Sequence, residues 1–140
     1  MSQAGPRPPG PPYLLDTHIW FWYLTGSTRL PHGLHAAIDE SIGQVWLSPI
    51  SVWELGMLNA RERVRLAGGI RAWTDEAQRR LPLEDASLTP EVALVSHEID
   101  LPHRDPADRF LAASAVVYGL TLLTVDERLR SATWLPTRGE

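Results

Sequence analysis

Short apolar runs alternate with longer segments of helical periodicity from Tyr13 onward. The runs that predict strands are residues 13–16 (YLLD), 44–47 (QVWL), 83–88, 120–125 (LTLLTV) and a last one around 133–135. The segments that predict helices are 18–24, 32–42, 49–60, 69–80, 90–99 and 106–118, with a short helix from Asp126. Strands separated by helices are typical of an α/β domain, with a mostly parallel sheet covered by helices on both faces.

Three of the helix starts carry the same local signal. Ser48-Pro49, Thr89-Pro90 and Asp105-Pro106 each place a good capping residue directly before a proline. The first side chain accepts a bond from a free backbone N–H, and proline suits the first helical position. These pairs predict helices that begin at Pro49, Pro90 and Pro106, and Gly43 and Gly119 are expected to end the helices before them.

Residues 1–12 hold five prolines and two glycines and have no apolar periodicity. This composition predicts a disordered or extended tail ahead of one domain over 13–140. The tail has no apolar core of a signal peptide, and no stretch of the chain approaches 18 consecutive apolar residues. We therefore expect a cytoplasmic protein without a membrane segment.

The amino-acid composition excludes several kinds of active-site chemistry. The 140 residues contain no cysteine, which excludes disulfides and thiolate sites. All 13 basic residues are arginines, so Schiff-base chemistry and a P-loop lysine are excluded as well. The net charge of −4 argues against a highly basic protein that coats nucleic acid.

Two predicted strands end at aspartates, and these are the first candidate site residues. Asp16 ends YLLD, and Asp126 follows LTLLTV. The carboxyl ends of adjacent parallel strands meet at one edge of a sheet, where α/β proteins place their functional crevice. Taken singly, each aspartate is equally well explained as a helix cap.

Glu54 and Asp108 are acids that lean toward apolar helix faces. Glu54 has Ile50, Met57 and Leu58 as its helical neighbours, and a carboxylate there is costly unless it is paired or binds a metal. The alternative is that Glu54 lies at the edge of the stripe and reaches water or an arginine. Asp108 lies in the first turn of its predicted helix, and Leu111, three positions later, lies on the same helix face. For Asp105, a capping role is a sufficient explanation.

Together, Asp16, Glu54, Asp108 and Asp126 predict one acidic pocket. Clustered carboxylates repel one another unless a divalent cation neutralises them. Ligands that are all oxygen favour Mg²⁺, with Mn²⁺ as a second possibility. A metal ion held by carboxylates is suited to hydrolysis of phosphodiester bonds.

Four segments in this order resemble the PIN-domain ribonucleases, and among them the VapC-type toxins of toxin–antitoxin pairs. The segments are YLLDTHIWFW, SPISVWELGML, HRDPADRFLAASA and GLTLLTVDERL, and the resemblance runs from Tyr13 to the end of the chain. It implies a three-layer α/β/α domain and a Mg²⁺-dependent endoribonuclease that cuts RNA and is inhibited by a small antitoxin protein. A phenylalanine that is frequent in the third segment is Ala107 here, which changes no acid.

The resemblance also implies roles for individual residues. The four acids of the family pattern fall on Asp16, Glu54, Asp108 and Asp126, with Asp105 as an auxiliary acid. Thr124, and less directly Thr17 or Ser51, is expected to hydrogen-bond the acids. A homodimer is expected from the family as well.

Arginines and tryptophans supply the remaining candidates. Arg104 and Arg109 are hypothesised to bind RNA phosphates, the alternative being ion pairs with the acids. Exposed tryptophans on the early helices would be anchors for an antitoxin, but core packing explains them equally well. These tryptophans are Trp20, Trp22 and Trp73, while Trp46 and Trp53 are expected in the core.

Two other functions are compatible with the same pattern. A non-catalytic PIN-fold module that binds a partner would keep the acids for folding or contact. A phosphatase with Asp16 as nucleophile is disfavoured, because position 18 is His rather than Asp and no lysine is present to hold the phosphate.

Overall fold

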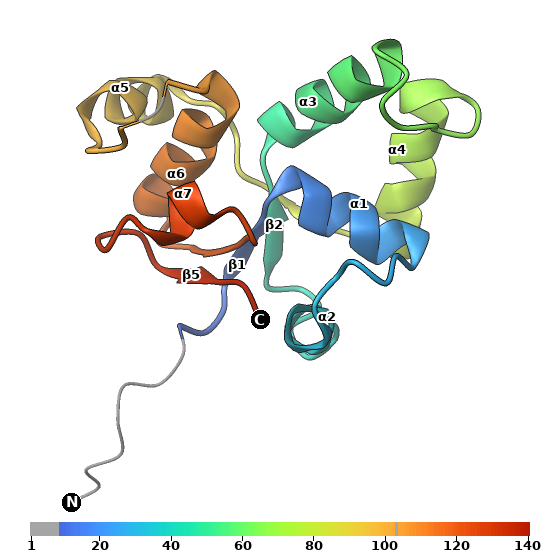
Figure 1. Ribbon diagram of the computed structural model, residues 1–140, viewed down its shortest axis with the longest axis horizontal. Helices are drawn as coiled ribbons and strands as arrows, with labels where there is room; N and C mark the ends of the chain where they lie inside the picture. The colour runs from blue at the N-terminus through green and yellow to red at the C-terminus, as the bar shows by residue number, and fades with distance from the viewer. Residues whose placement is uncertain (1–8, 103) are drawn as a thin grey trace, which may run out of the picture.

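The computed structural model describes residues 9–102 and 104–140, which form a central sheet between two layers of helices (Figure 1). The strands are β1 (Tyr13–Leu15), β2 (Val45–Leu47), β3 (Glu84–Asp85), β4 (Thr121–Leu123) and β5 (Thr137–Arg138). The helices are α1 (Thr17–Thr25), α2 (His32–Asp39), α3 (Pro49–Ala60), α4 (Gly69–Arg80), α5 (Pro90–Glu98), α6 (Pro106–Tyr118) and α7 (Glu127–Arg130). Every strand pair among the described residues is parallel, in the order β3-β2-β1-β4-β5. The predicted three-layer α/β/α fold is confirmed.

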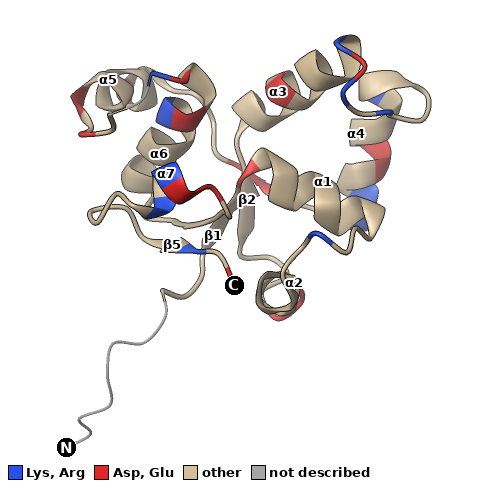
Figure 2. Ribbon diagram, viewed as in Figure 1, with Lys and Arg blue, Asp and Glu red and all other residues tan. Residues whose placement is uncertain are grey.

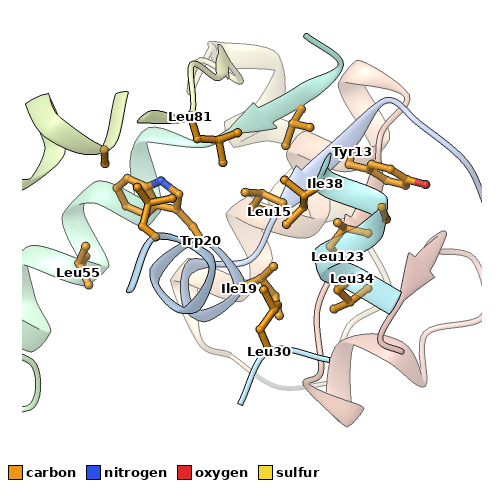
Figure 3. Packing of buried hydrophobic residues seen from close by; sticks show 14 of the residues in the cluster. Tyr13, Leu15, Ile19, Trp20, Leu30, Leu34, Ile38, Leu55, Leu81 and Leu123 are labelled. Carbon is orange, nitrogen blue, oxygen red and sulfur yellow. The ribbon is translucent and has the colours of Figure 1, made fainter. Parts of the chain in front are cut away.

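Side chains of the central strand β1 alternate between the two layers. Tyr13 and Leu15 pack into a core with α1–α4, which also contains Leu123 of β4 (Figure 3). Leu14 points to the opposite face, where it packs with Leu111 of α6. Because β1 and β4 are buried on both faces, they consist of continuous apolar runs instead of an alternating pattern.

The chain order creates a switch point between β1 and β4. From β1 the chain proceeds outward to β2 and β3, and it then returns through α5 and α6 to pair β4 with the free side of β1. The Asp16 backbone N–H donates to the Leu123 carbonyl at 3.0 Å, which holds the two strand ends together. The loops after β1 and β4 therefore leave side by side, the usual location of a functional crevice.

The three capping predictions are confirmed. The Ser48 hydroxyl accepts from the Ile50 N–H at 3.1 Å, and the Thr89 hydroxyl accepts from the Val92 N–H at 3.2 Å. The Asp105 carboxylate accepts from the Ala107 N–H at 3.0 Å. The third cap sets where α6 begins, and hence where Asp108 lies.

The prediction of a last strand around residues 133–135 is wrong. β5 comes later, at Thr137–Arg138, and pairs with β4. Leu135 is buried in the core, and the Trp134 indole N–H donates to the Asp100 carbonyl at 3.0 Å. The apolar residues that predicted a strand instead pack the turn after α7 onto the domain.

The other predicted boundaries differ less from those in the structure. The second helix ends at Asp39, three residues before the predicted Ile42, and turns occupy the residues up to Gly43. Most of the predicted tail lies outside the described residues. At its described end, the carbonyls of Gly10 and Pro12 accept hydrogen bonds from Thr121. None of the described helices is both long and apolar enough to cross a membrane.

Candidate active site

Four separate elements bring acids to the carboxyl edge of the sheet. Asp16 caps α1 directly after β1, and Asp126 caps α7 after β4. Glu54 lies in the middle of α3, and Asp108 lies in the first turn of α6. Figure 2 shows acidic positions at the starts of α1, α6 and α7 and within α3. The charges of Asp16 and Asp126 raise the pKa of Asp108, Asp126 also raises the pKa of Asp16, and Asp16 raises that of Glu54, so the predicted acids share one electrostatic site.

Asp16 is held rigidly by bonds to both of its oxygens. Its Oδ1 accepts from the Thr17 N–H at 2.7 Å, and its Oδ2 accepts from the Thr124 hydroxyl at 2.7 Å. The Thr124 oxygen in turn accepts from the Asp126 N–H at 3.0 Å, which links the ends of β1 and β4. Burial raises the pKa of Asp16, and these hydrogen bonds partly offset the rise. Thr124 thus positions the first acid and the loop that carries the fourth.

Asp108 is the most deeply buried acid of the site, with 6% of its surface exposed. Burial, followed by the negative charges of Asp105, Asp16 and Asp126, raises its pKa to about 7. The positive charge of Arg128 opposes this rise. This raised pKa favours the protonated form of the Asp108 carboxyl near neutral pH.

Glu54 is half-buried and faces the same group of charges. Burial is the largest cause of its raised pKa, with the charges of Asp16 and Asp105 adding to it. Hydrogen bonding from the Thr17 side chain opposes the rise. The Thr17 and Ser51 hydroxyl oxygens also lie at hydrogen-bond distance, 2.9 Å, within the buried contact of α1 and α3. The side of α3 that carries Glu54 is thereby tied to the start of α1.

Arg128 is a site residue that the sequence analysis did not identify. Its guanidinium bridges two acids, with Nη2 at 3.0 Å from Asp126 Oδ2 and at 3.3 Å from Asp108 Oδ2. Arg128 stands two positions after the capping Asp126 in the four-residue helix α7, and no local signal in the sequence predicts that it also contacts Asp108. The arginine supplies positive charge at the position where two predicted metal ligands come together.

The acids suit a divalent metal ion by their chemistry but are not arranged around one point. Among the described residues, no three histidine, aspartate or glutamate side chains are grouped closely enough to hold one ion. The donors are carboxylate oxygens, which Mg²⁺ and Mn²⁺ prefer, and buried like charges favour a bound cation. The Arg128 guanidinium contacts the Oδ2 atoms of Asp108 and Asp126, so a cation held by these two carboxylates would compete with it.

This competition makes a testable prediction for Arg128. Arg128→Gln removes a positive charge that contacts both Asp108 and Asp126, so we expect Mn²⁺ to bind roughly threefold to tenfold more tightly. Isothermal titration of the metal-free proteins with Mn²⁺ measures the change. Arg79→Gln is the matched control, because Arg79 pairs with the exposed Glu76 on α4. Weaker Mn²⁺ binding by Arg128→Gln would show that the guanidinium assists the ion instead of competing with it.

The two arginines hypothesised to bind RNA lie in different surroundings. Arg109 donates from Nε, Nη1 and Nη2 to the carbonyls of Ser96, Leu101 and Ile99, at 2.9, 2.7 and 3.1 Å. Its guanidinium is therefore used to hold the connection between α5 and α6, and we assign it a structural role. Arg104 is exposed just before α6 and remains a candidate for RNA contact.

The tryptophans divide between core and surface. Trp20 is buried and packs edge-on against Trp73 at 5.1 Å between ring centroids, so these two join α1 to α4. Trp53 was expected in the core, but it is 58% exposed because it lies on the outer side of α3. Trp22 is half-buried at the surface of α1, with the guanidinium of Arg29 at 5.2 Å from its ring centroid.

Comparisons with known proteins agree with this architecture. The model of the PIN domain family matches residues 13–135. Ribonuclease VapC22 of Mycobacterium tuberculosis is 33% identical over 121 residues, which cover 84% of this chain and 89% of that protein.

Several solved structures share the fold. VapBC2 of Rickettsia felis, crystallised with a DNA fragment from its promoter, superposes with a TM-score of 0.68 at 16% identity, covering 90% of this chain and 96% of that one. FitAcB of Neisseria gonorrhoeae gives a TM-score of 0.64 at 23% identity, with 91% and 96% covered. A toxin–antitoxin complex of Klebsiella pneumoniae gives 0.64 at 16% identity, also with 91% and 96% covered.

Proposed function

The chain belongs to the PIN-domain family and to its VapC-type members, and on this premise we propose that it is a Mg²⁺-dependent endoribonuclease. Its similarity to a protein named as a ribonuclease supports the activity. Its similarity in fold to toxin–antitoxin complexes supports a role as the toxin of such a pair. The substrate would be RNA and the inhibitor a separate antitoxin protein.

The observation that carries this proposal is the burial of Asp108 among other acids. A carboxylate that is 6% exposed and repelled by three neighbouring acids destabilises the fold at neutral pH. Such an arrangement is expected where charge is needed for chemistry. A bound divalent cation removes the repulsion and provides the reason for the acids to be together.

We propose that Asp16, Asp108 and Asp126 hold the ion, with Glu54 beside them. The ion supplies positive charge that activates water and stabilises the charge that develops on the phosphate. Asp16 is preorganised for this role by Thr17 and Thr124. Glu54, whose pKa is raised, would accept a proton from the attacking water. In-line attack by water would leave a 5′-phosphate and a 3′-hydroxyl.

Cleavage of RNA with and without metal tests the proposal. The purified chain is expected to cleave a mixed pool of cellular RNA with Mg²⁺, to stop with EDTA, and to resume when Mg²⁺ is added in excess. Asp16→Asn should be inactive under all three conditions. Activity that survives EDTA, or that is equal in Asp16→Asn, contradicts the mechanism.

The second candidate is a non-catalytic PIN-fold module that binds a partner. It is favoured by the fact that no three acids among the described residues are grouped around one point. Calorimetric titration with Mg²⁺ and Mn²⁺ separates the two functions. Metal binding that is lost in Asp16→Asn supports the nuclease, whereas no binding by the unmodified chain supports the module.

The predicted partners remain part of the proposal. The antitoxin would bind the chain and cover the acidic edge, and a homodimer is expected from the family. Large apolar side chains are exposed on three helices, namely Trp53 of α3, Leu94 of α5 and Val116 of α6, and in two connections, namely Ile42 and Leu88. Size-exclusion chromatography with light scattering, with and without the product of the adjacent reading frame, measures both assemblies.

A further inference from the structure

Two adjoining cavities run along α1 from the acidic edge toward the end of α3. The first, of about 300 Å³, is lined by Asp16 and Asp126 together with His18, Trp22 and Arg29. The second, of about 330 Å³, shares the last three residues and adds Arg63 after α3. Because the cavities share three lining residues, they form one continuous depression. We call it the α1 groove and define it by His18, Trp22, Arg29 and Arg63.

The groove carries positive charge that no carboxylate of the described residues neutralises. Arg29 and Arg63 are exposed, and neither has a carboxylate partner among the described residues. They come from connections far apart in the sequence, between α1 and α2 and between α3 and α4. Figure 2 shows basic positions on both connections. In a chain with a net charge of −4, two unpaired arginines directly beside an acidic edge indicate an anionic ligand.

Aromatic side chains lie beside these arginines in the groove. Arg29 lies over the Trp22 ring at 5.2 Å, and the His18 ring lies 5.7 Å from Trp22 on the preceding turn of α1. Trp22 is half-buried, so its position is set by packing while part of its ring reaches the groove. Single-stranded RNA is bound by this combination, in which bases stack on aromatic or guanidinium planes and arginines contact phosphates.

We propose that the α1 groove binds the single-stranded RNA segment on one side of the bond that is cut. Arg29 and Arg63 contact consecutive phosphates, and Trp22 provides a stacking surface for a base. The groove opens at Asp16 and Asp126, so an RNA strand that follows it reaches the acids. This inference rests on the proposed ribonuclease function and names the residues that bind its substrate.

Binding of a fluorescein-labelled 12-nucleotide single-stranded RNA tests the proposal. Anisotropy is measured in an Asp108→Asn background, so that the probe is not cut. Arg29→Gln combined with Arg63→Gln should weaken binding by roughly tenfold to a hundredfold and lower the salt dependence by about two phosphate contacts. The doubly substituted protein should fold normally, because neither guanidinium pairs with a described acid. Thermal melting verifies this.

The control is Arg71→Gln, which removes one charge from an exposed position of α4 outside the groove. If the groove variant binds the RNA as tightly as this control, the proposal is overturned. It is also overturned if the groove variant keeps its RNA affinity but loses binding to the protein from the adjacent reading frame, since the groove then serves a protein partner. Failure of the unmodified chain to cleave any RNA with Mg²⁺ contradicts the proposed function but not RNA binding in the groove.

Discussion

Asp108→Asn is expected to lose ribonuclease activity by at least about 100-fold, because the charge stabilisation that depends on this acid is worth several kcal/mol. The substitution keeps the size of the side chain and removes only its negative charge. The measurement is the initial rate of RNA cleavage in Mg²⁺ relative to the unmodified chain.

The same variant is expected to be as stable as the unmodified chain, or more stable, at pH 8 without metal. Neutralising a buried carboxylate removes its desolvation cost and its repulsion from the other acids. Asp75→Asn is the matched control, since Asp75 is exposed on α4 and should affect neither property. Loss of activity together with unfolding would not support a catalytic role, and full activity in Asp108→Asn would exclude it.

Stability of the metal-free protein is expected to fall as the pH rises through 7. The pKa of Asp108 is about 7 in the folded chain and 3.8 in the unfolded chain. The folded state therefore holds a proton that the unfolded state has released, and this contribution to stability is lost as the pH rises through the folded value. Between pH 6 and pH 8 the loss is on the order of 1 kcal/mol. Burial of Asp16 and Glu54, whose pKa values are also raised, acts in the same direction.

Thermal melting in EDTA at pH 6, 7 and 8 measures this effect. The loss corresponds to a fall in Tm of a few degrees, roughly 2–6 °C, for a domain of this size. In Asp108→Asn the dependence on pH should be clearly weaker, and Mg²⁺ should weaken it in the unmodified chain by favouring the ionised carboxylates. A Tm that is equal at pH 6 and pH 8 in both proteins would contradict the raised pKa of Asp108.

Local signals in the sequence were sufficient to locate the acids on their elements. A cap followed by proline sets the first turn of a helix within one or two residues, so Asp105 and Asp108 were placed correctly on α6. An apolar run that ends in an acid marks the end of a buried strand, as at Asp16. These signals depend on neighbours within four residues, which a single sequence contains in full.

Contacts between side chains and segments distant in the sequence were not predicted. Arg109 is bound to the carbonyls at the end of α5, and Arg128 is bound to Asp108, twenty positions earlier. Nothing in the spacing of arginines indicates which carbonyl or carboxylate each guanidinium will meet. The last strand was misplaced for a related reason, because Trp134 and Leu135 pack against the core and do not pair with β4.

The sequence by itself determined the alternation of strands and helices, the acid at the end of each central strand, and the absence of thiol and lysine chemistry. These properties follow from periodicity, capping and composition, which are local. Only the tertiary structure decided that Asp108 is buried, that Arg128 bridges it to Asp126, and that Arg29 and Arg63 line one groove beside the acids. Burial, pKa values and ion pairs depend on neighbouring residues that folding brings together from distant parts of the chain.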